Sequence, residues 1–423
     1  MLQVFKFGGA SVKDASSVKN VASILKKYKQ TPLCVVVSAM GKTTNALERL
    51  VNAYIHKTEN AEQILEEIKS FHFDICKELF ETETHAVFTE LENTFLEIHW
   101  AIEDEPSSNY DFEYDQIVGI GELLSTKIVS AYLTETGIKN LWIDARGIIQ
   151  TDNTYREGKV DFELTQTLVT KEVLPKFSEF DIIITQGFIG GTSENFMTTL
   201  GREGSDYTAS ILAYCLNASQ VTIWKDVPGV LNADPKWFSR TKKIDELTYH
   251  DAIELTYYGA TIIHHKTIKP LQNKNIALHV KSFINPDEKG TIIQDNDKRL
   301  NFPTYIFKVN QVLISIQPKD FSFIAEGNLS EIFDAFSKCG VKINLMQLSA
   351  ISFSVCCDYN ADKINHLVLT LQNQYKVLYN TDVELMTIRY YTQETIDALT
   401  TRKIILLEQK SRYTVQMVMK NEL

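Results

Sequence analysis

The chain lacks an excess of basic residues. Its 54 Asp and Glu residues outnumber its 43 Lys and Arg residues, and the formal net charge is −11. Negative charge of this size opposes general binding to nucleic acid or to anionic membranes, so we expect neither as a partner. No apolar run approaches the roughly 20 residues that a membrane-spanning helix needs. Because residues 1–3 lead directly into an expected strand bearing Lys6, we also expect no secretory leader.

The chain is also poor in cysteine, and its cysteines do not form a recognisable pattern. Most of them fall within apolar stretches and lack the spacing of metal ligands; they are Cys34, Cys76, Cys215, Cys339, Cys356 and Cys357. We therefore expect buried thiols in a reducing compartment and predict a cytoplasmic protein. The histidines between residues 56 and 99 are scattered, and the adjacent His264 and His265 fit a structural role better than a metal site, so no metal ligands are predicted.

With 423 residues, the chain is long enough for two or three domains. Short apolar runs alternate with helical patterns over the first 300 residues. Strands are expected at residues 2–7, 33–38, 141–144, 182–186, 221–224 and 277–281, and helices at 117–133, 205–216 and 249–258. Several of these strands are apolar on both faces, as in a parallel sheet covered by helices. The pattern predicts an α/β three-layer sandwich with a mainly parallel sheet, with residues 57–106 as inserted helices.

The pattern changes beyond a turn-rich stretch and a polar linker at residues 295–303. Strand, helix, strand, strand, helix and strand are expected in turn at 312–316, 329–337, 341–349, 353–358, 364–371 and 383–391. This βαββαβ order predicts a small ferredoxin-like unit. A shorter set follows at 392–398, 403–408 and 413–419. This region lacks glycine-rich loops and clustered catalytic groups. We therefore expect it to serve in ligand binding or in assembly rather than in catalysis.

The opening run Val4-Phe5-Lys6-Phe7-Gly8-Gly9-Ala10-Ser11 is a candidate phosphate site. It predicts a buried strand, a tight turn and then a helix. Glycines at such a junction let backbone N–H groups approach an anion, and the helix N-terminus adds partial positive charge. Lys6 can neutralise phosphate oxygens. A surface lysine beside an ordinary turn gives the same pattern, because a lone glycine pair is a weak motif.

Two further segments place polar groups at the start of a helix. In residues 35–45 a strand ends in hydroxyl residues that include Ser38 and Thr44, and helix capping also explains them. The sequence Gly41-Lys42-Thr43 suggests a P-loop, but Val36 stands where that motif needs its first glycine. Glu122 lies among glycines at a helical stretch. It is either a solvated first-turn glutamate or a partner for a substrate ammonium group.

Residues 198–209 form the densest polar segment. Arg202 is flanked by glycines and can bind a carboxylate through two parallel hydrogen bonds. Ser205 and Asp206 open a helix, and Asp206 would hold positive groups in place rather than bind phosphate. A helix cap is the alternative for this pair. Residues 223–236 form a strand followed by a long polar turn, which is where nucleotides bind in open α/β sheets.

Taken together, six segments in order resemble aspartate kinases of the amino acid kinase family. They read KFGGAS, VVVSAMGKTTNAL, GIGELLS, TLGREGSDYTASILA, IWKDVPGVLNADPK and ELTYYGATIIHHKTI. The resemblance implies a catalytic domain at residues 1–295, with an aspartate lobe at about 1–198 and an ATP lobe at about 199–295. It also implies a tandem ACT-like regulatory region at 303–423, whose second unit is shortened and in which 303–309 pairs with the last strands.

The resemblance implies transfer of the ATP γ-phosphoryl group to the side chain of L-aspartate, giving 4-phospho-L-aspartate. This is the first step of lysine, threonine and methionine biosynthesis, and Mg²⁺ would be carried with ATP. The implied catalytic residues are Lys6 and Asp206. The implied aspartate contacts are Ser38, Thr44, Glu122, Arg202, Glu203, Gly204 and Ser205. The implied nucleotide contacts are Lys6, Gly8, Gly9, Lys225, Asp226, Leu231, Lys236, Thr261 and Ile262.

Several positions depart from the family pattern. Glu203 stands where the family often has a glycine, and Leu231 stands where tyrosine is usual. Thr261 stands where family members commonly have a lysine that reaches the phosphates. These departures keep two alternatives open: an amino-acid sensor with impaired catalysis, or an amino acid kinase with another acceptor. The ACT-like region implies a lysine or threonine effector near residues 322–329 and 344–349, and a homodimer or higher homo-oligomer.

Overall fold

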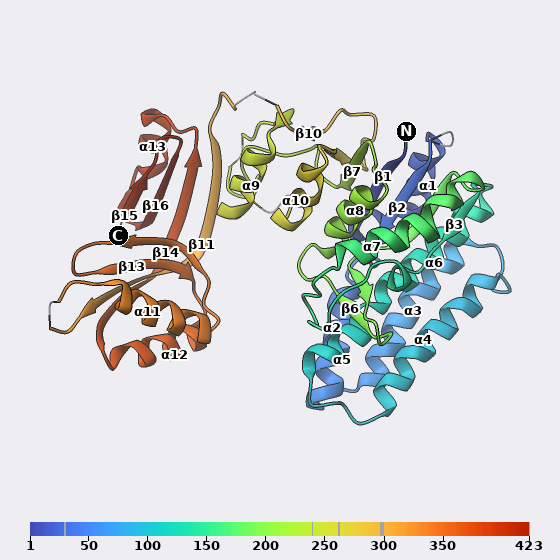
Figure 1. Cartoon of the computed structure of the whole chain (residues 1–423), viewed down its shortest axis with the longest axis horizontal. Coiled ribbons are helices and arrows are strands. Elements are labelled where there is room, and N and C mark those ends of the chain that lie inside the picture. Colours follow the sequence, from blue (N-terminus) through green and yellow to red (C-terminus); the bar gives the residue numbers. More distant parts are fainter. Residues whose placement is uncertain (29–30, 239, 261–262, 297–299, 321, 423) are drawn as a thin grey trace. The chain divides into compact units, whose positions relative to one another are not determined.

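The computed structural model describes residues 1–28, 31–238, 240–260, 263–296, 300–320 and 322–422 (Figure 1). The chain divides into two compact units. The first comprises Met1–Val230, Lys243–Ile253 and Ile262–Lys298, and the second comprises Leu231–Lys242, Glu254–Thr261 and Arg299–Leu423. The six cysteines are buried and free, as expected for structural thiols.

The first unit is built on an eight-stranded sheet with the order β3-β4-β2-β1-β7-β9-β10-β8. The strands are β1 (Gln3–Phe7), β2 (Leu33–Val37), β3 (Asn140–Trp142), β4 (Ile182–Gln186), β7 (Gln220–Lys225), β8 (Glu246–Leu247), β9 (Ala277–Ser282) and β10 (Thr291–Ile293). Every residue of β2 and β4 is buried, which is why both read as continuous apolar runs. All pairs are parallel except β9 with β10, so the predicted mainly parallel sheet is confirmed.

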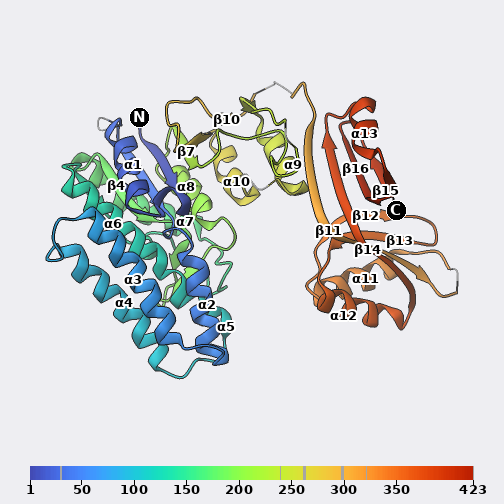
Figure 2. The same cartoon turned by 180° about the vertical axis from the view of Figure 1, so that it is seen from behind.

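Helices cover both faces of this sheet (Figures 1 and 2). On one face α8 (Gly204–Cys215) contacts β1, β2 and β7, and α7 (Phe162–Leu168) and α10 (His265–Asn273) pack beside it. On the other face α6 (Ile120–Glu135) contacts β2, β3 and β4, with α1 (Ala15–Lys26) next to it. This arrangement is the expected three-layer sandwich.

Four more helices pack around α6 and α1. They are α2 (Thr43–His56), α3 (Ala61–Leu79), α4 (Ala86–Glu103) and α5 (Tyr110–Val118). The helices α3 and α4 run side by side (Figures 1 and 2) and account for the insertion predicted at residues 57–106. Short elements complete the unit: the strands β5 (Ile189–Gly191) and β6 (Met197–Thr199), a π turn at Val169–Val173, and 3₁₀ turns at Gly9–Val12, Ala145–Gly147 and Leu174–Ser178.

The helix predicted over residues 117–133 is α6 apart from its start, because Gly119 separates α6 from the preceding helix α5. A Cβ atom at Gly119 would lie 2.7 Å from the Met197 sulfur, so close packing requires glycine there. In the described part of the chain, Tyr110–Glu135 is the one segment long and apolar enough to cross a membrane. Burial inside the unit accounts for this composition, since 72% of its most apolar window is covered by protein.

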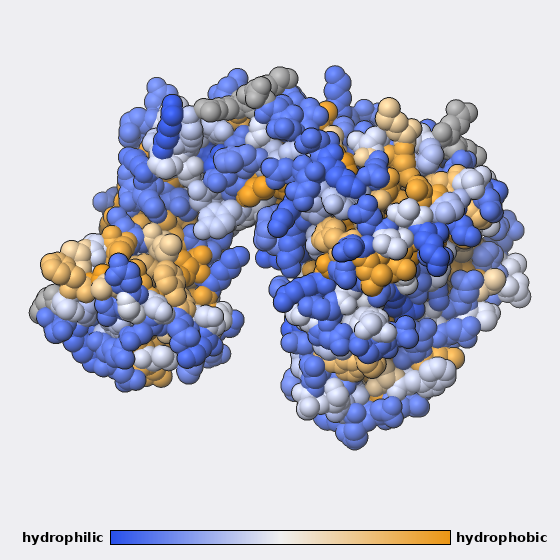
Figure 3. All heavy atoms as spheres, in the orientation of Figure 1, coloured by the Kyte–Doolittle hydropathy of each residue, from blue (hydrophilic) through white to orange (hydrophobic). Residues whose placement is uncertain are grey.

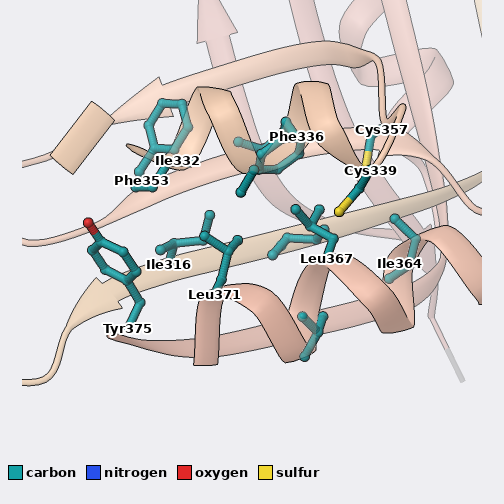
Figure 4. Close-up of a cluster of buried hydrophobic side chains, with 14 of the residues drawn as sticks. Ile316, Ile332, Phe336, Cys339, Phe353, Cys357, Ile364, Leu367, Leu371 and Tyr375 are labelled. Carbon is teal, nitrogen blue, oxygen red and sulfur yellow. The ribbon is translucent and has the colours of Figure 1, made fainter. Parts of the chain in front are cut away.

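The second unit carries an antiparallel sheet with the order β12-β13-β11-β14-β16-β15. Its first part runs β11 (Thr304–Pro318), α11 (Glu326–Lys338), β12 (Ile343–Leu348), β13 (Phe353–Asp358), α12 (Ala361–Gln372) and β14 (Tyr375–Arg389). This is the predicted βαββαβ unit. Figure 4 shows its core, in which Phe336 of α11 and Leu367 of α12 pack with buried residues of the sheet such as Ile316.

Two strands of this sheet are longer than predicted, because β11 and β14 each extend over 15 residues. A register irregularity between Lys308 and Gln311, with Asn310 at a φ of +53°, divides β11 into two halves. The first half pairs with the end of β14, which also pairs with β16 (Thr414–Asn421); α13 (Gln393–Thr400) and β15 (Lys403–Lys410) complete this end. Figure 3 shows apolar patches over strands of the C-terminal sheet, and further apolar patches over the first unit.

Candidate active site

A cavity of about 840 Å³ lies in the first unit, at the carboxyl ends of its parallel strands. In open α/β sheets this is where ligands bind. The predicted site residues that line it are Lys6, Ser38, Thr44, Glu122, Arg202, Glu203, Gly204, Ser205, Asp206 and Lys225. The structure therefore brings together groups from the ends of β1, β2 and β7 and from the starts of α2, α6 and α8.

Asp206 is the charged centre of the cavity. It lies in the first turn of α8 and is buried, and Lys6 Nζ lies 2.6 Å from its Oδ1. Lys225 Nζ lies 3.4 Å from its Oδ2. Burial raises the pKa of Asp206, but the two ammonium groups outweigh it, so the pKa lies below its usual value. The ionised carboxylate of Asp206 thus positions the ammonium groups of Lys6 and Lys225 at the cavity.

Glu122 supplies a second buried carboxyl group, from the first turn of α6. The backbone N–H of Ala39 donates to its Oε1 at 3.2 Å, while Oε2 has no hydrogen-bond partner among the described residues. Burial raises the pKa of Glu122 to about 8, although the Ala39 hydrogen bond and the Lys6 charge oppose the rise. A buried carboxyl oxygen without a donor beside a cavity is suited to receive an ammonium group.

The segment before α8 has an unusual backbone. Glu203 is the N-cap residue and adopts a left-handed conformation with a φ of +53°, which is costly for a residue with a Cβ atom. Its Oε2 is buried and has no hydrogen-bond partner among the described residues. Burial raises the pKa of Glu203, and the nearby Lys225 charge opposes this. Arg202 precedes it with an exposed side chain that lines the cavity.

The glycines of the opening run have a structural reason. A Cβ atom at Gly9 would lie 2.7 Å from the carbonyl oxygen of Ala39, so only glycine lets this turn approach the loop after β2. The N–H of Gly41 donates to the Gly9 carbonyl at 3.1 Å and fixes this approach. A Cβ atom at Gly8 would lie 3.4 Å from Lys6 Nζ. Neither glycine is among the residues that line the cavity.

Asp226, Leu231 and Lys236, three of the remaining predicted nucleotide contacts, are not among the residues that line the cavity. Asp226 is exposed directly after Lys225. Leu231 and Lys236 belong to the second compact unit. Thr261 and Ile262 lie outside the described residues. Within the described ranges, no group of three or more His, Cys, Asp or Glu side chains is arranged to hold a metal ion.

The cavity also has lining residues that we did not predict, including Tyr114 and Arg156. The Arg156 guanidinium lies 4.3 Å from the centre of the Tyr114 ring. Asp115 fixes this wall by accepting hydrogen bonds from the N–H groups of Arg156 at 2.8 Å and Thr199 at 2.9 Å. Burial raises the pKa of Asp115 to about 6. The local sequence does not single out Asp115, because α5 also carries Asp111 and Glu113. The polar stretch around Arg156 has no regular pattern to place it.

Comparison with known proteins identifies the family of the chain. The model of the amino acid kinase family matches residues 1–282. The lysine-sensitive aspartokinase 3 of Escherichia coli is 31% identical over 84% of this chain and 78% of its own length. Aspartokinase 1 of Arabidopsis thaliana, a chloroplastic protein, is 32% identical, and the match covers 84% of this chain but 63% of that longer protein.

Solved structures lead to the same family. E. coli aspartokinase III in complex with aspartate and ADP superimposes with a TM-score of 0.85, at 26% identity, covering 100% of this chain and 97% of that one. The same enzyme in complex with lysine and aspartate gives a TM-score of 0.83 at 26% identity, covering 99% and 95%. The chain therefore belongs to the amino acid kinase family and, within it, to the aspartokinases.

Proposed function

We propose that this aspartokinase transfers the γ-phosphoryl group of ATP to the side-chain carboxylate of L-aspartate, giving 4-phospho-L-aspartate and ADP. The observation that carries the proposal is the Lys6–Asp206–Lys225 cluster in the same cavity as Glu122 and Arg202. The two lysines can bind phosphate groups, and the negative Glu122 and positive Arg202 beside them can bind the charged ends of an amino acid. The cytoplasm is the proposed compartment, because the pathway intermediates are small soluble metabolites and all six thiols are free.

The aspartate would be held by its two charged ends. The guanidinium of Arg202 can bind the α-carboxylate through two hydrogen bonds, and the unpartnered Oε2 of Glu122 can accept from the α-ammonium group. The same cavity is lined by Ser38, Thr44, Glu203, Gly204 and Ser205. The reacting carboxylate, with an ordinary pKa near ~4, is already ionised at neutral pH, so no general base is required.

The chemical task is therefore to align two anions and to offset their charge. Lys6 and the N-terminus of α8 supply positive charge at the cavity, and Asp206 positions Lys6. Mg²⁺ carried with ATP would neutralise part of the phosphate charge. We assign Gly8, Gly9, Lys225, Asp226, Leu231, Lys236, Thr261 and Ile262 to the nucleotide.

One coupled assay for ADP release tests the proposal, with aspartate, glutamate or no acceptor in parallel reactions. We expect ADP release that requires aspartate. Release with glutamate instead would favour a kinase with another acceptor. Absence of release with any acceptor, together with retained binding of aspartate by calorimetry, would favour a sensor without catalysis.

We also propose that the second unit binds an amino-acid effector, with lysine first among the candidates because the E. coli relative is lysine-sensitive. The proposed contact segments are residues 322–329 and 344–349. In the latter, Asn344 Oδ1 already accepts from Lys308 at 2.9 Å, and its amide donates to Gln311. Inhibition of ADP release by millimolar lysine, but not threonine, is the expected result, and no inhibition by either would count against this site.

A homodimer or higher homo-oligomer is the proposed assembly. Apolar side chains on the second sheet are open to solvent, with Met346 and Leu348 of β12 each 50% exposed and Ile404 of β15 40% exposed. Exposed apolar groups on the two edge strands of this sheet suit contact with a further copy of the chain. Sedimentation of the purified protein at a mass above 48.2 kDa is expected, and a monomer at micromolar concentration would contradict it.

A further inference from the structure

Lys6 and Lys225 project from the same face of the sheet. Parallel pairing places Lys6 of β1 opposite Ile223 of β7, and Lys225 follows Ile223 by two residues. Because side chains alternate along a strand, all three point to one side. That side is covered by α8, whose Asp206 contacts both ammonium groups. Lys225 therefore lies about 7 Å further along the strand direction than Lys6, at the carboxyl end of β7.

One lysine would be enough to neutralise Asp206. Lys6 contacts one carboxylate oxygen at 2.6 Å, and its side chain is 10% exposed. Lys225 contacts the other oxygen at the longer distance of 3.4 Å, and its side chain is 22% exposed. Lys225 is therefore the more accessible ammonium group of the pair. Both line the cavity.

The charge of Lys225 also opposes the rise in the pKa of Glu203. Glu203 is the N-cap residue of α8 and Asp206 lies in its first turn, so the Lys225 ammonium group, which contacts Asp206, lies close to the helix N-terminus. Backbone N–H groups at such a terminus favour an anion. An incoming phosphoryl group would meet a lysine and a helix terminus at the same place.

We propose that Lys225 is a second catalytic cation, which contacts the transferring phosphoryl group together with Lys6. The inference rests on the proposed function and assigns Lys225 a role in the chemical step in addition to nucleotide binding. In that step an aspartate oxygen forms a bond to the γ-phosphorus, the bond to the β-phosphate oxygen breaks, and its electron pair stays on ADP. Lys225 forms no covalent bond; it offsets negative charge on the equatorial oxygens.

The test compares Lys225→Met with Lys225→Arg and with a matched control. Lys281 of β9 is the control, since it pairs with Trp224, lies 5.3 Å from that ring and does not line the cavity. Loss of one charge-stabilising donor typically lowers turnover on the order of 10²-fold, and we expect this for Lys225→Met at saturating ATP and aspartate. Lys225→Arg should retain part of the activity, and Lys281→Met should leave turnover unchanged.

A binding readout separates a catalytic role from a structural one. We expect Lys225→Met to bind ADP alone within about 3-fold of the unmodified protein, but to lose roughly 10²-fold in affinity for ADP, aspartate and aluminium fluoride together, because this mixture mimics the transferring group. If Lys225→Met folds poorly, Lys225→Cys treated with 2-bromoethylamine restores an ammonium group. The six native cysteines are buried, so the new thiol is the accessible target.

Three results would overturn the proposal. Lys225→Met could keep its turnover and raise only the KM for ATP, which would make Lys225 a nucleotide-binding residue alone. Equal losses of affinity for ADP and for the aluminium fluoride mixture would lead to the same conclusion. A Lys225→Cys protein that stays inactive after aminoethylation would show that the charge is not what matters. Failure of the unmodified protein to release ADP with aspartate would instead refute the proposed function itself.

Discussion

Replacing Glu122 by glutamine should stabilise the protein without substrate and weaken its binding of aspartate. Glu122 is 3% exposed, and its Oε2 has no hydrogen-bond partner among the described residues. Glutamine keeps the shape of the side chain and an oxygen that can accept from Ala39 N–H. It removes the charge that burial disfavours. The same change removes the partner proposed for the substrate ammonium group, so stability and binding should move in opposite directions.

The size of the stability effect follows from the pKa of Glu122, which burial raises from 4.5 to about 8. Below pH 4.5 both the folded and the unfolded state carry the proton, and the shift has no effect. Between pH 4.5 and 8 the unfolded state loses the proton first, so the fold loses about 1.4 kcal/mol per pH unit. Above pH 8 the loss is complete, at about 4–5 kcal/mol as an upper bound.

Thermal unfolding at a series of pH values from 5 to 8.5 measures this effect. The Tm of Glu122→Gln should exceed that of the unmodified protein by an amount that grows with pH. Glu113→Gln is the control, because Glu113 is a buried glutamate on α5 that accepts from Ser107 N–H at 2.8 Å and does not line the cavity. Because Glu113 lies outside the cavity, its replacement should leave the aspartate KM unchanged.

Steady-state kinetics at pH 8 measure the binding effect. A hydrogen bond to a charged group contributes about 1.5–3 kcal/mol, so the aspartate KM of Glu122→Gln should rise by roughly 10–150-fold. In the unmodified protein, Glu122 must lose its proton before it accepts the ammonium group, and the aspartate KM should therefore rise as the pH falls below 8. A Tm difference that does not change with pH, combined with an unchanged KM, would refute the role of Glu122.

Three further variants test the rest of the cavity. Lys6→Ala should lower turnover on the order of 10²-fold, and near-normal turnover in the ADP-release assay would remove Lys6 from the mechanism. Arg202→Ala should raise the aspartate KM by about 10-fold or more, because a bidentate carboxylate contact is lost; an unchanged KM would contradict its role. Glu203→Gly should raise the free energy of unfolding by about 1 kcal/mol, since glycine adopts the left-handed backbone without strain; denaturant titration would show the reverse if the Glu203 side chain stabilises the fold.

Much of the sheet and its helices could be predicted from the sequence. The strands β2 and β4 are buried throughout, so burial on both faces leaves a continuous apolar run that is easy to recognise. The strands β8 and β10 have two and three residues, which is too short to show any period. The long β14 was only half predicted, because its first part, around residues 376–382, is largely exposed and carries few apolar residues on a regular face.

The candidate site could be predicted where its residues open or close an element. The ends of strands and the starts of helices can be recognised from local sequence. Four of the site residues lie at such positions, namely Lys6, Ser38, Glu122 and Asp206. Arg156 lies in a loop that reaches the cavity through hydrogen bonds to Asp115, a contact 41 residues distant in sequence. Such a contact depends on the tertiary fold, so no local pattern could reveal it.

The start of α8 explains why so many of the site residues are close in sequence. Arg202, Glu203, Ser205 and Asp206 surround one helix N-terminus, which is a region of partial positive charge. A helix end can present only a few residues to a cavity, and both ammonium groups come from the neighbouring strands, Lys6 from β1 and Lys225 from β7. The paired lysines are therefore a consequence of parallel topology: adjacent parallel strands end at the same edge of the sheet, where one buried carboxylate can contact both.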